Sequence, residues 1–189
     1  MIRILFICTG NMHRSALAER LLAAKIPPDS TVLPTSAGTK AQPQPGMDPA
    51  TQEVLRKLGG DGHGFAPQAL TTELVTESSL ILGLAREHRE AAVRLAPSAM
   101  RRCFTLKEFV RLASAVDAAQ TEGGFSEVVA AAATRRGIAG PVPPDQDDIE
   151  DPRGKPVPIL FKCACEIAGQ VNKLSRLLKE ATQFCDATP

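Results

Sequence analysis

Short apolar runs alternate with stretches of helical periodicity along this chain, and the alternation restricts its possible folds more than any other feature. Four runs predict strands, at residues 2–7, about 31–36, 79–84 and 102–106. Apolar residues at helical spacing lie between these runs, at about 14–26, 48–58 and 86–95. This order indicates right-handed βαβ crossovers and therefore an α/β fold, with a parallel sheet covered on both faces.

The chain after the fourth predicted strand is expected to be mostly helical. Helical patterns begin near Leu106, over 125–136 and from Pro158, and the Pro- and Asp-rich stretch at 140–152 between the last two is expected to be a loop without regular structure. We expect one domain over residues 1–182, because 189 residues suffice for a single α/β core. The expected domain includes an extended segment at about 107–146, and residues 183–189 are expected to form a tail.

Charge and cysteine usage restrict the possible partners. The 22 basic and 21 acidic residues give a net charge of +1, so no broad field is expected for nucleic acid or a membrane surface. The apolar runs are too short to span a bilayer. Five cysteines, scattered without zinc-ligand spacing, favour a reducing compartment. We therefore expect a cytoplasmic protein without a metal or another cofactor.

The first predicted strand ends in a loop that joins it to a predicted helix. This loop runs from Cys8 to Ser15 and holds a thiol and the guanidinium of Arg14. Backbone N–H groups at a helix N-terminus lack intrahelical partners and favour anions. The predicted phosphate-binding residues are Thr9, Gly10, Asn11, Met12, His13, Arg14 and Ser15.

The residue types in this loop suit attack on phosphorus. A helix N-terminus and a neighbouring cation stabilise a thiolate, so Cys8 is the candidate nucleophile. Arg14 can bind two phosphoryl oxygens as a fork. Ser15 is expected to donate to the sulfur, and Asn11 is expected to lock the loop with a backbone conformation that costs most residues energy.

The run from Cys8 to Ser15 resembles the phosphate loop of the low-molecular-weight protein tyrosine phosphatases, and the run from Ser36 to Thr39 resembles that family's second strand end. The resemblance implies a three-layer, doubly wound α/β fold with strand order 2-1-3-4. It also implies that Asp151, followed by Pro152, is the general acid. From spacing alone, Asp147, Asp148 and Glu150 compete for that role.

The chain departs from the family pattern around the substrate pocket. His13 stands where the family commonly has a second cysteine, so we expect peroxide to oxidise Cys8 irreversibly. The aromatic walls of the family's pocket are replaced near Lys40 and Arg153. We expect Met12, Lys40 and Arg153 to line the pocket, with Phe161 or the 107–146 segment as candidate substitute walls.

The resemblance predicts a metal-independent phosphomonoester hydrolase with a phosphocysteine intermediate, most similar to a protein tyrosine phosphatase but with an altered pocket. Its substrate is expected to be a phosphorylated protein or a small phosphoester, with phosphoarginine as an alternative. An arsenate reductase is disfavoured because Cys103, Cys163 and Cys165 fall in apparent core patterns. A phosphate-binding regulator without turnover is a further alternative. His88, on the helix after the third strand, is expected at the surface.

Overall fold

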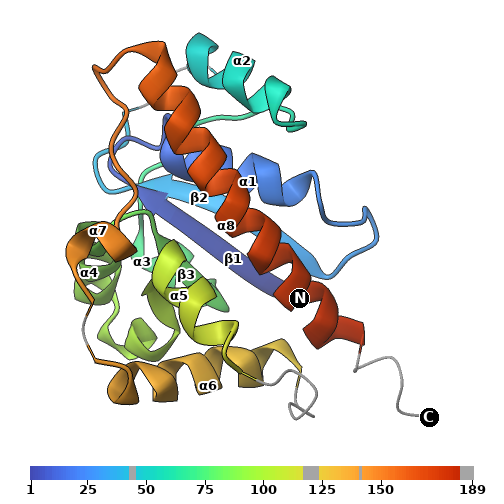
Figure 1. Cartoon of the computed structure of the whole chain (residues 1–189), viewed down its shortest axis with the longest axis vertical. Helices are drawn as coiled ribbons and strands as arrows, with labels where there is room; N and C mark the ends of the chain where they lie inside the picture. The colour runs from blue at the N-terminus through green and yellow to red at the C-terminus, as the bar shows by residue number, and fades with distance from the viewer. Residues whose placement is uncertain (43–45, 117–123, 141, 184–189) are drawn as a thin grey trace.

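The computed structural model describes residues 1–42, 46–116, 124–140 and 142–183. Four parallel strands form one sheet in the order β2-β1-β3-β4 (Figure 1), as the resemblance implied. The strands are β1 (Ile2–Cys8), β2 (Val32–Gly38), β3 (Leu80–Gly83) and β4 (Cys103–Thr105).

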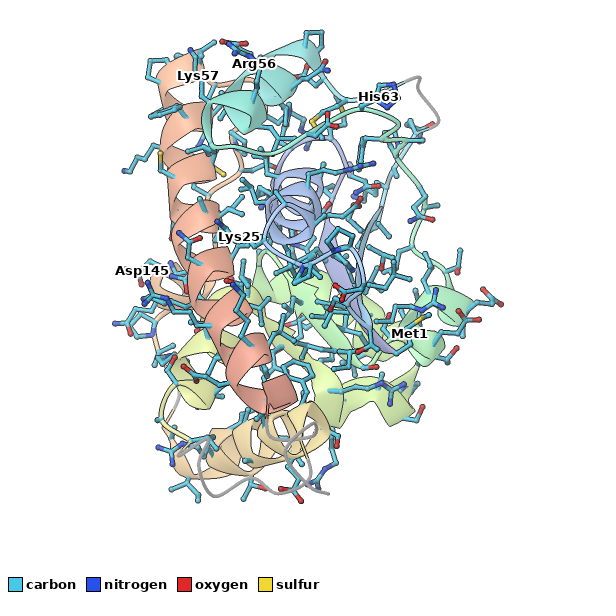
Figure 2. The ribbon with its side chains drawn as sticks, turned by 90° about the vertical axis from the view of Figure 1, so that its right-hand side faces the viewer. Met1, Lys25, Arg56, Lys57, His63 and Asp145 are labelled. Carbon is cyan, nitrogen blue, oxygen red and sulfur yellow. The ribbon has the colours of Figure 1, made fainter. Side chains whose placement is uncertain are left out.

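Helices cover both faces of the sheet, because β1 places apolar side chains alternately on its two sides. Ile4 and Phe6 belong to the larger core cluster, with residues of α1 (Arg14–Ala23), α5 (Leu106–Ala113) and α8 (Val157–Gln183). Leu5 and Ile7 belong to a smaller cluster with α3 (Thr72–Glu77) and α4 (Arg86–Leu95). Figure 2 shows α8 along one side of the sheet.

The register of the sheet brings the carboxyl ends of three strands together. Cys8 pairs with Gly38 at the end of β2, and Ile7 pairs with Gly83 at the end of β3. The strand order reverses at β1, where open parallel sheets form their ligand crevices. Figure 1 shows the segment between α7 (Pro144–Asp147) and α8 passing the arrowhead of β1.

The structure corrects several expected boundaries. The loop expected at 140–152 contains one helical turn, α7, because Pro144 at its first position suits a helix start. The sequence pattern gave no sign of α3 or of the 3-10 helix η1 (Pro97–Arg102), which are both only six residues long. The helices α1, α2 (Pro49–Lys57), α4 and α5 lie where they were expected.

Two helices contain most of the described part of the extended segment. Its α5 packs on α6 (Phe125–Ile138), with the rings of Phe109 and Phe125 6.3 Å apart. Figure 1 shows α6 at the end of the molecule opposite α2. Residues 117–123 of the segment and 184–189 of the expected tail lie outside the described residues. Among the helices that are described, none has both the length and the apolar character needed to cross a membrane.

Candidate active site

The loop after β1 lies directly against the end of β2, and Gly38 makes this approach possible. Thr39 and Lys40 donate backbone hydrogen bonds to the carbonyls of Cys8 and Thr9, at 2.9 and 2.8 Å. A Cβ atom at position 38 would lie 2.7 Å from the Thr9 oxygen and 2.8 Å from the Asn11 nitrogen, so only glycine fits here.

Asn11 locks the loop from inside. Its φ of 52° is the only positive value at a non-glycine residue in the described parts of the chain. Its buried side-chain amide donates to Ser15 Oγ at 2.9 Å and to Ser36 Oγ at 2.8 Å, and its oxygen accepts from the Gln68 backbone at 2.8 Å. These bonds offset the cost of the left-handed conformation. The contact with Gln68 was not predicted, because its sequence neighbourhood shows no loop-binding motif.

Cys8 and Ser15 are in hydrogen-bond contact. The Cys8 sulfur and Ser15 Oγ are 3.0 Å apart, and both residues are buried. Because Ser15 Oγ accepts the amide of Asn11, its own proton can be donated to the sulfur, or more weakly to the Ala37 carbonyl at 3.5 Å. A sulfur anion here can therefore accept a hydrogen bond from the Ser15 hydroxyl.

A small cavity of about 20 Å³ lies above the sulfur. It is lined by Cys8, Thr9, Gly10, Met12, His13, Arg14, Asp151 and Arg153. Within the described residues, no backbone N–H group of residues 9–13 donates a hydrogen bond. Together with the N-terminus of α1, these groups form a cradle suited to an oxyanion.

The side chain of Arg14 reaches across this cavity to the loop that precedes α8. Its Nη2 lies 2.7 Å from Asp151 Oδ2, and its Nη1 donates to the Ile149 carbonyl at 3.0 Å. The Arg14 side chain is only 5% exposed, whereas that of Asp151 is 37% exposed. A charged residue buried to this extent needs partners, and they come from the segment between α7 and α8, residues 148–156, which we call the acid loop.

The neighbouring carboxylates have other contacts. Asp147 accepts from Arg86 and Arg111 at 2.8 and 3.1 Å. Asp148 accepts from the backbone N–H of Arg86 at 2.8 Å, and the exposed Glu150 pairs with Lys155. Of the four acids, Asp151 alone lines the cavity in the described structure.

His88 is buried, contrary to the expected surface position. Its side chain is 1% exposed, and its Nε2 lies 3.0 Å from Thr9 Oγ1. Burial, with a smaller effect from Arg14, lowers the pKa of His88 to about 4, although Asp151 opposes the shift. The imidazole is therefore neutral near pH 7. The position of His88 on an amphipathic helix did not predict its contact with Thr9, because the contact depends on how α4 packs on β3.

The predicted pocket residues divide into two groups. Met12 and Arg153 line the cavity, but the exposed Lys40 does not. Phe161 is 42% exposed and is not a wall of the cavity. His13 lines it and is anchored by its Nδ1, which lies 2.5 Å from Thr51 Oγ1.

Two further expectations concerned cysteines. Cys103 and Cys163 are buried, and burial raises the pKa of each thiol to about 12. Cys165 is exposed, contrary to its expected place in the core. It lies on the outer face of α8, two positions from the inward-facing Cys163.

Comparison with known proteins shows the family to which the chain belongs. The sequence pattern described as low molecular weight phosphotyrosine protein phosphatase matches residues 3–128. The chain belongs to this family. The matched residues of this phosphatase family end before Asp151, so the position of that acid opposite Arg14 comes from the structure.

Individual relatives include phosphatases named for two specificities, phosphotyrosine and phosphoarginine in proteins. A low molecular weight protein-tyrosine-phosphatase of Escherichia coli is 34% identical over 94 residues, which are 50% of this chain and 62% of the relative. A protein-arginine-phosphatase of Geobacillus stearothermophilus is 35% identical over 130 residues, which are 69% of this chain and 85% of the relative. The chain spans 62–65% of the length of the first curated relatives that it matches.

Solved structures of the family share the fold. An arginine phosphatase from Geobacillus stearothermophilus superimposes with a TM-score of 0.72 at 25% identity, covering 100% of this chain and 99% of the other. A low molecular weight protein tyrosine phosphatase from T. tengcongensis gives a TM-score of 0.68 at 27% identity, with 92% and 97% covered.

Proposed function

We propose that this chain is a cysteine-dependent phosphatase of phosphorylated proteins. The observation that carries the proposal is the common cavity of Cys8, Arg14 and Asp151, with unused backbone N–H groups around it. A nucleophile, a fixed cation and an acid in one small cavity are the groups that phosphoryl transfer needs.

In the proposed first step, the Cys8 thiolate attacks phosphorus and the bond to the leaving group breaks. Arg14 and the N–H groups of residues 9–13 hold the equatorial oxygens. A phosphoryl group bound by Arg14 replaces Asp151 as a partner of the guanidinium. Asp151, which enters this step as the protonated acid, then gives its proton to the departing atom and becomes a carboxylate.

In the second step, water attacks the phosphocysteine and the sulfur departs as a thiolate. The Asp151 carboxylate accepts a proton from this water, so one residue serves as acid and then as base. The Ser15 hydroxyl, 3.0 Å from the sulfur, stabilises the departing anion. The cycle needs no reductant, and none of Cys103, Cys163 and Cys165 lines the cavity, which disfavours a thiol-based reductase.

The lining of the cavity supports a substrate whose leaving group is not the aromatic ring of phosphotyrosine. His13 is the only lining residue with a ring, and Met12 and Arg153 occupy the rest of the rim. A flexible thioether and a cation fit leaving groups of several shapes. Phosphoarginine in proteins is the second candidate substrate, because the arginine phosphatase relative is matched over 85% of its length.

A substrate panel tests the proposal. Wild type, Cys8→Ser and Cys103→Ser are compared on para-nitrophenyl phosphate, a phosphotyrosine peptide, a phosphoarginine peptide and an aliphatic phosphomonoester. Cys8→Ser is expected to abolish all turnover, whereas Cys103→Ser, which changes a buried cysteine outside the cavity, retains it. Turnover by Cys8→Ser at the wild-type rate contradicts the proposal.

A further inference from the structure

The contact between Thr9 and His88 joins the cavity wall to a helix that the proposed mechanism does not use. Thr9 lines the cavity next to Cys8, and its hydroxyl meets His88 Nε2 at 3.0 Å. The start of α4 packs very close to the end of β3. A Cβ atom at Gly83 would lie 2.7 Å from the Arg89 nitrogen and 3.2 Å from His88 Cβ. Glycine at the end of β3 therefore lets the first turn of α4 reach the loop.

The direction of the hydrogen bond follows from the surroundings of the imidazole. His88 Nε2 also lies 3.3 Å from the carboxylate oxygen Oε1 of Glu87, which can only accept. His88 Nδ1 is buried and has no partner in the described structure. A neutral ring with its proton on Nε2 satisfies this arrangement, whereas a lone pair on Nε2 would face the carboxylate. Nε2–H therefore donates, and Thr9 Oγ1 accepts.

A hydroxyl that accepts from the imidazole keeps its own proton for another partner. Thr9 Oγ1 has no second protein partner in the described residues, and the residue borders the cavity above Cys8. We infer that the Thr9 hydroxyl donates a hydrogen bond to a phosphoryl oxygen, and that His88 is the positioning residue that fixes its direction. This inference rests on the proposed function, and it adds a side-chain donor to the backbone cradle.

The arrangement has a chemical consequence for the transition state. A hydroxyl fixed from behind does not need to reorient when charge builds on the phosphoryl oxygens, so it stabilises the transition state more than a freely rotating one. Neutral His88 suits this role, because a protonated ring would add a competing positive charge behind the loop. Its low pKa, caused mainly by burial, keeps it neutral above about pH 5.

Matched variants separate this role from a merely structural one. Thr9→Val removes the hydroxyl with little change of shape, Thr9→Ser restores a hydroxyl, and His88→Leu removes the imidazole donor. Thr35→Val is the control, because it removes a part-buried hydroxyl of β2 that bonds to the Ile4 carbonyl and does not line the cavity. Thermal unfolding of each variant verifies the fold.

Inhibition by orthovanadate and kcat/KM for para-nitrophenyl phosphate are the two readouts. Thr9→Val is expected to lower vanadate affinity and kcat/KM roughly 10- to 100-fold, with Thr9→Ser within roughly 3-fold of wild type. His88→Leu is expected to lose roughly 10-fold, and the double variant Thr9→Val/His88→Leu to lose no more than Thr9→Val alone.

Additive losses in the double variant, or wild-type vanadate affinity in a folded Thr9→Val, overturn the inference. A wild type that turns over para-nitrophenyl phosphate alongside an unaffected Thr9→Val leaves the proposed function intact and removes only this inference. A wild type that binds vanadate without turnover contradicts the proposed function, and the vanadate affinities of the variants then decide the inference. A wild type that does neither removes both.

Discussion

Arg14 and Asp151 are held together as an ion pair 2.7 Å long, although 137 positions separate them in the chain. The contact brings the proposed acid to the proposed phosphate ligand and fixes where the loop before α8 crosses the cavity. Because the Asp151 side chain is 37% exposed and that of Arg14 is 5% exposed, the acid is the more accessible partner. A bound phosphoryl group is expected to replace Asp151 as a hydrogen-bond partner of the Arg14 guanidinium.

Replacing Asp151 with Asn is expected to slow the hydrolysis of a substrate more when its leaving group is more basic. The amide cannot donate the proton that a phenolate needs when Cys8 is phosphorylated, so kcat/KM for phenyl phosphate is expected to fall roughly 100- to 1,000-fold. Para-nitrophenolate departs readily without a proton, so kcat/KM for para-nitrophenyl phosphate is expected to fall much less. Steady-state kinetics with both esters measure the difference. Glu150→Gln is the control, because Glu150 is exposed and pairs with Lys155. Equal losses with the two esters contradict the assignment of the acid.

Asp147 is expected to support activity by anchoring the acid loop. Its buried carboxylate joins Arg86 on α4 to Arg111 on α5, and Asp147→Asn removes the charge from both contacts. We expect a loss of about 2 kcal/mol in the free energy of unfolding, measured by urea denaturation, and a lower kcat. Asp145→Asn is the matched control at an exposed position (Figure 2). An Asp147→Asn protein with the stability and kcat of the control disproves the anchoring role.

Gly38→Ala is expected to displace the phosphate loop. The added Cβ atom meets backbone atoms of Thr9 and Asn11, which cannot move without distorting the cavity. We expect about 1–3 kcal/mol of destabilisation and a large loss of kcat/KM. Gly137→Ala, in an exposed helical position with open space around it, is expected instead to stabilise by about 0.5–1 kcal/mol. Wild-type kcat/KM in Gly38→Ala is the result that the structure does not allow.

His88 is expected to make stability depend on pH below neutrality. The pKa of its ring is about 4 in the folded protein and 6.5 in the unfolded chain, so the unfolded state binds more protons between these values. Arg14, Asp151 and Glu87 are the charged groups around it. Stability is therefore expected to be lost as pH falls from 6.5 to 4, by about 3 kcal/mol in all.

Urea denaturation of wild type and His88→Gln at several pH values measures this contribution as a difference. The variant is expected to lose less stability between pH 6.5 and 4 than wild type does. His63→Gln, which removes an exposed imidazole (Figure 2), is the control. Parallel stability curves for wild type and His88→Gln count against a buried neutral imidazole.

The parts of the fold that local patterns encode were predictable. The apolar run of β1 and the helical spacing after it placed the loop from Cys8 to Ser15 at a strand-to-helix junction, and the structure has this junction. The short elements α3, η1 and α7 carry too few residues for a periodic pattern. Their positions depend on packing and on proline and capping residues instead.

The site was predictable where one segment contains the chemistry, and less so where distant segments meet. Cys8, Ser15 and Asn11 make contacts within the loop that residue types alone suggested. Spacing could not separate Asp151 from Asp147, because their different arginine partners come from α1, α4 and α5. The burial of His88 depends on Gly83 permitting a close approach, which no pattern within α4 records.

Chemical trapping of the enzyme during turnover tests the central claim most directly. Asp151→Asn is mixed with para-nitrophenyl phosphate, quenched in acid within the first turnovers and digested for mass spectrometry, with Cys8→Ser/Asp151→Asn treated in parallel. The mechanism predicts a phosphoryl group on the sulfur of Cys8 that decays as substrate is exhausted. Turnover without phosphate on Cys8, or with phosphate on another side chain, contradicts it.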